Sequence, residues 1–192
     1  MPLSADDARH LIESRKVLTG PFRWMPRWRE ESDRKKMDKQ ERPLTPLRLD
    51  LVSALAIDGV QPRGLRLRAS VFPRRTNAAM FQLECAMVPP QGNRRHELYR
   101  MEWNPIRGHT NALDCADPDI AGMYFGPGDT HEHSCLDHLS GKGFVRVNDV
   151  HAARPIFPDP ADFKDALTYV CARICIENGG DIRPPVAQGE LV

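Results

Sequence analysis

Apolar and polar residues alternate in four segments in the middle of the chain, at residues 47–57, 65–71, 79–87 and 96–103. In the second segment, for example, Leu65, Leu67 and Ala69 are separated by arginines. An alternation of period two places one set of side chains on a buried face and the other on a wet face of a β-strand. Turn residues such as Asp58-Gly59 separate the segments. The pattern therefore predicts an antiparallel β-meander of four or more strands.

Helical spacing of apolar residues frames this meander at both ends of the chain. Near the N-terminus the pattern predicts a helix that Ser4 caps and that continues to residue 18. Near the C-terminus it predicts a second helix, with Asp159 as the N-cap, a proline in the first turn and an end at Gly179-Gly180. We therefore expect an α+β fold with the N-terminal and C-terminal helices packed on one face of the sheet.

Length and composition favour one domain. The chain has 192 residues, 41% of them hydrophobic and 28% charged, which fits a single α+β domain over residues 1–192. Within it we expect a basic, tryptophan-containing excursion at residues 21–46 and a flexible tail at residues 181–192. The N-terminal residues lack a secretory signal and no apolar run approaches membrane-spanning length, which predicts a cytoplasmic protein without a membrane partner. The five cysteines contain no Cys-x-x-Cys pair and read as reduced thiols.

The densest group of reactive side chains lies at residues 130–138, which contain three histidines, one cysteine and two acidic residues. In an extended segment, His131 and His133 would project to the same face. Two neighbouring imidazoles suit a divalent metal such as zinc, with His109, Cys135 or His138 as further ligands. The same imidazoles suit metal-free acid–base catalysis, and histidines of this spacing also occur as solvated loop residues. The sequence leaves these alternatives open.

A second group follows the fourth predicted strand. Arg100 and Glu102 share the polar face of that strand, which leads into a turn bearing His109 and Asn111. Arginine suits bidentate contact with a phosphate or carboxylate, and asparagine can orient an imidazole or a substrate. An ordinary exposed Arg/Glu pair, with Asn111 serving the turn, is the alternative.

The order of these motifs resembles a family of small uncharacterised bacterial and phage-encoded proteins. The shared features are Leu-Tyr-Arg-Met-Glu at 98–102, His-Thr-Asn at 109–111, His-Glu-His at 131–133 and a closing helix containing Cys171. The resemblance covers about the last two thirds of the chain, while each motif is short. Where the family continues with Pro-Asp-Gly, this chain has Ala-Leu-Asp at 112–114. The resemblance implies that Arg100, His109, Asn111, His131 and His133 form one constellation, and it implies no substrate.

The third feature is the basic region at 21–42, in which arginines and lysines are interleaved with Trp24 and Trp28. Such a mixture can contact phosphates and stack on unpaired bases, which suggests a nucleic-acid or protein partner. Five acidic residues in the same stretch offset much of its charge, and mixed-sign runs are usually solvated surface. We favour the solvated surface.

Two functional hypotheses follow, and the sequence does not decide whether the chain is an enzyme. In the first, a polar His/Arg site acts on a phosphodiester or nucleotide substrate. Its catalytic residues would be His109, His131, His133, Arg100 and Asn111, and its metal ligands His131, His133 and His109. The second is a non-catalytic binding module, such as a phage-related or toxin-neutralising partner, that recognises protein or nucleic acid through residues 21–42. Zinc or another divalent metal is the candidate cofactor for the first hypothesis.

Overall fold

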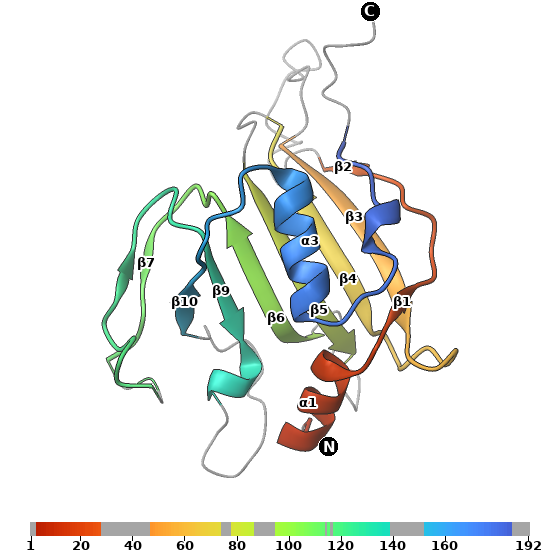
Figure 1. Ribbon diagram of the computed structural model, residues 1–192, viewed down its shortest axis with the longest axis horizontal. Coiled ribbons are helices and arrows are strands. Elements are labelled where there is room, and N and C mark those ends of the chain that lie inside the picture. Colours follow the sequence, from red (N-terminus) through yellow and green to blue (C-terminus); the bar gives the residue numbers. More distant parts are fainter. Residues whose placement is uncertain are drawn as a thin grey trace, which may run out of the picture.

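The computed structural model describes residues 3–27, 47–73, 78–86, 95–113, 115, 117–138 and 152–185. These residues form an antiparallel sheet of eight strands accompanied by two α-helices (Figure 1), which agrees with the predicted α+β class. Its four central strands are sequence neighbours and confirm the meander. They are β3 (Arg48–Ala56), β4 (Arg66–Val71), β5 (Ala79–Ala86) and β6 (Arg95–Trp103).

Short strands extend the meander on both sides. At one edge, β1 (Val17–Leu18) and β2 (Met25–Arg27) both pair with β3. At the other, β6 pairs with β9 (His131–Ser134), which pairs with β10 (Ala153–Pro155). A separate two-stranded sheet consists of β7 (His109–Thr110) and β8 (Tyr124–Phe125) and lies beyond β10 in Figure 1. The sheet therefore brings the histidine-rich β9 directly beside the arginine-bearing β6.

A β-bulge changes the alternation in β6. The register with β5 shifts at Leu83/Glu84, so Tyr99 opposes Leu83 while Glu97 opposes Glu84. Leu98 is the extra residue and is fully buried in the core, although simple alternation predicts it on the polar face with Arg100. The bulge restores Glu97 to the face of Arg100, three residues further along.

The helices differ from the sequence prediction at their ends. The helix α1 (Ala5–Glu13) has the predicted Ser4 cap, but it stops at Glu13. Lys16 is buried and its ammonium donates to the carbonyls of Ile12 and Ser14, which satisfies the helix end and lets the chain enter β1. Burial lowers the pKa of Lys16 to about 8.

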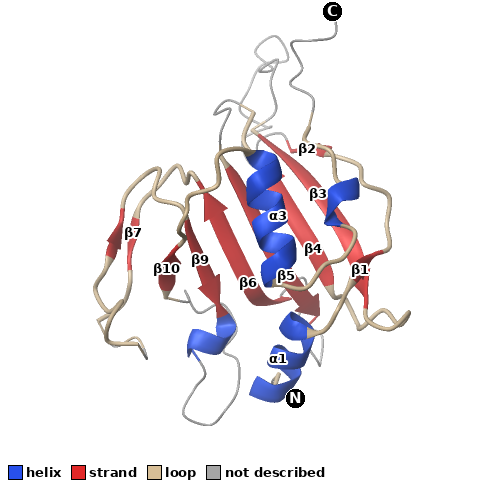
Figure 2. Cartoon of the chain, in the orientation of Figure 1, coloured by secondary structure: helices blue, strands red, loops and turns tan. Residues whose placement is uncertain are grey.

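The second helix, α3 (Phe163–Arg173), is shorter than predicted. It begins later in the sequence and ends earlier. Its N-cap is Asp162, whose carboxylate accepts from the Asp165 amide, and not Asp159. It ends at Arg173, and the diglycine belongs to a separate 3₁₀ turn, η2 (Gly179–Asp181). Another 3₁₀ turn, η1 (Cys135–His138), follows β9. Figure 2 shows α3 in front of the central strands.

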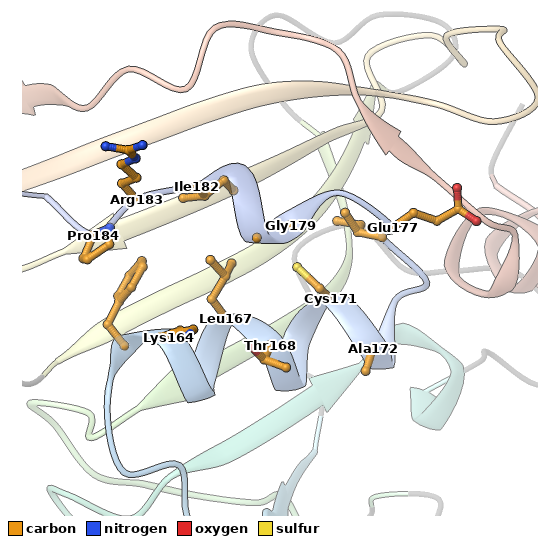
Figure 3. A pocket seen from close by; sticks show the side chains of 13 residues that line it. Lys164, Leu167, Thr168, Cys171, Ala172, Glu177, Gly179, Ile182, Arg183 and Pro184 are labelled. Carbon is orange, nitrogen blue, oxygen red and sulfur yellow. The ribbon is translucent and has the colours of Figure 1, made fainter.

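The main core lies between α3 and the sheet face that it covers. Its fully buried members include Leu51, Leu67, Phe81, Met101 and Val170. An apolar groove of about 480 Å³ lies on this side, between α3 and the segment around η2. Arg183 and Glu177 lie at its two ends (Figure 3), and apolar side chains such as Leu167 line it between them. The lining of the groove is mainly apolar.

A buried carboxylate fastens β9 to α3. Glu132 lies between two histidines in sequence but projects to the α3 side, where its Oε2 accepts from the hydroxyls of Tyr99 (2.8 Å) and Tyr169 (3.2 Å). Arg173 also contacts it at 3.2 Å. Burial and the adjoining carboxylate raise the pKa of Tyr169 to about 12. Glu132 therefore fixes which face of β9 its neighbours occupy.

We expect Glu132→Ala to destabilise the protein by about 1–3 kcal/mol, because the buried Tyr99 hydroxyl would lose its acceptor. Urea unfolding measures this loss. Adding Tyr99→Phe to Glu132→Ala should then cost less than Tyr99→Phe costs in the wild-type chain, since the hydroxyl has already lost its partner. Equal costs in both backgrounds would show that the two side chains are not coupled.

Candidate active site

The site lies on the sheet face opposite α3. Because side chains alternate along β9 and Glu132 points to α3, His131 and His133 both point to the other face. Both are fully buried. The register places His133 opposite Arg100 and His131 opposite Glu102. The predicted extended geometry of this segment is confirmed.

The β7–β8 hairpin supplies the third imidazole. The His109 ring lies 4.8 Å from the His131 ring and 5.1 Å from the His133 ring, centre to centre, and the latter two rings are 5.0 Å apart. One nitrogen of each ring lies within 4.8 Å of the other two. Phe125 of β8 stacks on His109 at 5.4 Å and contacts His131 at 4.8 Å. The predicted histidine cluster is thus confirmed, with Phe125 as an apolar wall.

Asn111 joins this hairpin to the main sheet. Its amide nitrogen donates to the carbonyls of Ile120 and Ala153, both at 2.9 Å, and its oxygen accepts from the Ala153 amide at 2.8 Å. Ala153 is the residue of β10 that pairs with His133. The side chain therefore binds the backbone of β10 and holds the hairpin beside it, close to the cluster.

Within the cluster, two imidazole nitrogens are buried and have no hydrogen-bond partner among the described residues, as is also true of Nδ1 of His96 outside it. The two in the cluster are Nε2 of His109 and Nε2 of His131. The Nδ1 of His131 lies 2.6 Å from the carbonyl of Asp129, which can only accept. Nδ1 therefore carries the proton and donates it, which leaves a lone pair on Nε2 of His131. Metal-ligating histidines commonly have this arrangement, in which a carbonyl fixes the tautomer.

Arg100 and Glu102 form the polar border of the cluster. Nη2 of Arg100 donates to Nε2 of His133 at 3.3 Å, and Nε of Arg100 lies 3.2 Å from Glu102. That 3.2 Å contact is an ion pair without hydrogen-bond alignment. The Glu102 carboxylate lies 3.9 Å from His133 Nε2, and Glu97 contacts the guanidinium at 3.6 Å. Two carboxylates thus hold one arginine against the imidazoles.

Burial favours the neutral imidazole of His109 and of His131. Desolvation lowers the pKa of His109 and of His131 below 6.5, with a smaller opposing effect from Glu102. Desolvation also lowers the pKa of His96, which is buried outside the cluster. A neutral imidazole is the form that binds a metal or acts as a base.

These shifts predict an acid-labile apoprotein. When the folded-state pKa of a histidine lies below 6.5, the unfolded chain takes up the proton at a higher pH than the folded chain does. The free energy of unfolding is therefore largest above about pH 6.5 and decreases as the pH falls toward the lowered pKa. The slope should be at most about 1.4 kcal/mol per pH unit for each such histidine. Urea unfolding of metal-free protein between about pH 7 and 5 measures it. Stability that stays constant over this interval would contradict the neutral buried state.

Not every predicted candidate joins the cluster. Cys135 is fully buried in the core on the α3 side, where burial raises its pKa to about 12, so its thiol is neither near the histidines nor ionised. The His138 side chain lies outside the described part of the chain. Sequence reasoning missed Phe125 and Asp129, which lie in a stretch rich in glycine and proline without a detectable period. Two sequence features could have indicated these residues, namely their position shortly before His131 and the Tyr-Phe pair at 124–125.

The basic region at 21–42 is described only up to residue 27. Trp24 is half-buried, stacks edge-on against Phe163 at 5.9 Å and donates to the Arg183 carbonyl, so its ring belongs to the α3 side of the fold. Arg27 belongs to β2 and contacts Asp50 at 3.3 Å. Residues 28–46, including Trp28, lie outside the described residues, as does the tail from residue 186.

Comparison with known proteins finds no matching family model, no matching curated protein and no matching solved structure. Neither described α-helix has the length and apolar character that crossing a membrane requires.

Proposed function

We propose that the protein binds one divalent metal ion, of which zinc fits best, and hydrolyses a phosphodiester or nucleotide substrate. The ligands would be His109, His131 and His133. The observation that carries the proposal is the pair of buried Nε2 atoms, on adjacent rings, that have no hydrogen-bond partner in the described part of the chain, one of them in a tautomer fixed by the Asp129 carbonyl. Leaving such polar atoms unsatisfied costs about 1–3 kcal/mol each, which a metal bond would offset.

The donor set suits zinc and related metals. Imidazole nitrogens bind zinc at about 2.0–2.1 Å, so three of them around a tetrahedral ion lie about 3.3 Å apart. The donor atoms here lie within 4.8 Å of one another, so the rings would approach by about an ångström or more where they are widest apart. Three protein ligands leave a fourth position open, as catalytic zinc sites require. We expect both terminal helices to cover the α3 side of the sheet, so that the substrate binds on the opposite face, where the histidines lie.

Arg100 would bind the substrate phosphate. A metal bond through His133 Nε2 would replace the hydrogen bond that this atom accepts from Arg100. The guanidinium would keep its contacts with Glu97 and Glu102. The N–H group that had donated to His133 could then donate to a non-bridging phosphate oxygen. Arginine is suited to that role because it stays protonated and can donate two parallel hydrogen bonds.

The reaction would be the addition of water to the phosphorus atom. A divalent metal held by the three histidines would supply a nucleophilic water at neutral pH and polarise a phosphoryl oxygen. Glu102, which is 3.9 Å from His133 Nε2, would accept the proton that the attacking water loses. One P–O ester bond then breaks, and its oxygen leaves with the electron pair and takes up a proton.

The test is hydrolysis of bis(p-nitrophenyl) phosphate by protein stripped with a chelator and then loaded with zinc, manganese, cobalt or nickel. We expect activity that requires the metal and saturates at one ion per chain. Arg100→Gln should lower the rate by about a hundredfold with the metal still bound, whereas the exposed Arg15→Gln should leave it unchanged. Activity that survives complete metal removal would favour metal-free acid–base catalysis, and no activity with any of these metals would refute the hydrolase.

A further inference from the structure

We infer that an arginine patch on the same sheet face binds the phosphate backbone of a polynucleotide whose scissile bond lies at the histidines. The patch consists of Arg27, Arg48 and Arg68, and the inference rests on the proposed function because it names the substrate class of that site. All three guanidiniums converge on one buried carboxylate, Asp50, at 3.3, 2.7 and 2.9 Å respectively.

The patch carries more positive charge than Asp50 needs. Ser70 already donates to Asp50 at 2.7 Å, and one arginine would neutralise the carboxylate. Three guanidiniums against one carboxylate leave two positive charges in surplus. Among the described residues, the other acidic group within reach is Glu84, which lies 4.0 Å from Arg68 and is paired with Arg66 at 2.5 Å. The surplus charge is available to an anion.

The strand register also places two positively charged side chains next to each other, which lowers the stability of the sheet. Arg27 of β2 lies directly opposite Arg48 of β3, an arrangement that destabilises a sheet. Nε of Arg68 is buried and has no hydrogen-bond partner among the described residues. Arg27 is 61% exposed on its side chain, and Arg48 and Arg68 remain 30% and 24% exposed. An external phosphate would offset the repulsion between Arg27 and Arg48.

The patch and the histidines belong to the same rows of the sheet. One row runs through successive register partners Arg68, Gln82, Arg100 and His133. The next runs through Asp50, Ser70, Met80, Glu102 and His131. These side chains therefore all project to the face opposite α3.

The separation indicates the size of the ligand. Four inter-strand steps of about 4.8 Å separate Asp50 from His131, or about 19 Å. A stacked strand advances about 3.4 Å per nucleotide, so a ligand that contacts both ends spans about five or six nucleotides. A mononucleotide cannot reach both ends. The middle of the rows carries no surplus positive charge, because two carboxylates, Glu97 and Glu102, lie at Arg100, and in the neighbouring row Arg66 is paired with Glu84.

The experiment measures binding without requiring catalysis. Fluorescence anisotropy would follow labelled single-stranded RNA and DNA of about 12 nucleotides with metal-free protein, from about 50 to 200 mM salt. We expect Arg27→Gln and Arg48→Gln each to weaken binding about fivefold at 0.1 M salt and to reduce the salt slope by about 0.7. Arg15→Gln, which is 86% exposed and paired with Glu177, is the matched control and should bind as the wild type does.

Arg27 provides a variant whose folding is secure, because Arg48, Arg68 and Ser70 would still hold Asp50. Equal affinity and salt slope for wild type, Arg27→Gln and Arg48→Gln would overturn the inference. Arginine-dependent binding without metal-dependent hydrolysis would leave the patch standing and remove the hydrolase. Hydrolysis of the small diester without oligonucleotide binding would support the hydrolase and refute the arginine patch as a binding site.

Discussion

Replacing His131 by Gln should lower the affinity for zinc by about a thousandfold or more and abolish metal-dependent hydrolysis. The ring is fully buried, its Nδ1 donates to Asp129, and its Nε2 is the nitrogen with a lone pair left for a metal. Glutamine keeps a polar side chain of similar length, so the loss would reflect the ligand more than a cavity. Competition with a chromophoric chelator measures the affinity.

His10→Ala is the matched control for that experiment. His10 lies on the exposed face of α1 and hydrogen-bonds only to Ser14 within the described chain, so its loss should change neither zinc affinity nor rate. The three cluster variants, at 109, 131 and 133, should each lose the metal. A variant at 131 that keeps wild-type affinity would show that the metal binds elsewhere.

Substituting Gly108 by Ala should disable the site although it changes no ligand. A Cβ atom at this position would collide with the Phe125 carbonyl oxygen and would lie 2.8 Å from the Tyr124 hydroxyl. The carbonyl belongs to the backbone of β8, so the hairpin itself would have to separate, and His109 is the next residue. We expect zinc affinity to fall about 10- to 100-fold, as it does when the support of a ligand is lost.

Gly180→Ala serves as the control, because a Cβ atom there meets nothing within 4 Å. Urea unfolding should separate a local change from a global one. The eight-stranded sheet does not include the β7–β8 pair, so Gly108→Ala should lose metal affinity with little change in the main unfolding transition. Unaltered zinc binding by Gly108→Ala would mean that His109 is not held by this hairpin contact.

Local patterns predicted the parts of the fold that depend on local physics. The four central strands follow from alternation at residues such as Leu67 and Ala69, whose burial is complete. The pairing of His131 and His133 on one face follows from the same period. The Ser4 cap follows from the preference of helix ends for a side-chain acceptor.

Features fixed by contacts distant in the sequence could not be predicted. The end of α1 depends on the burial of Lys16 against residues after α3, shown by the amide of Lys16 donating to Cys175. The bulge at Leu98 depends on pairing with β5. The approach of His109 to β9 depends on Asn111 binding the backbone of β10, about 40 residues away in sequence, and no local pattern records that contact.

X-ray absorption at the zinc edge of the loaded protein tests the metal centre most directly. Three imidazole nitrogens at about 2.0 Å, one zinc per chain and loss of this signal in His131→Gln are the expected result. A first shell containing sulfur at about 2.3 Å, or a protein that retains no zinc after dialysis, would contradict a three-histidine centre.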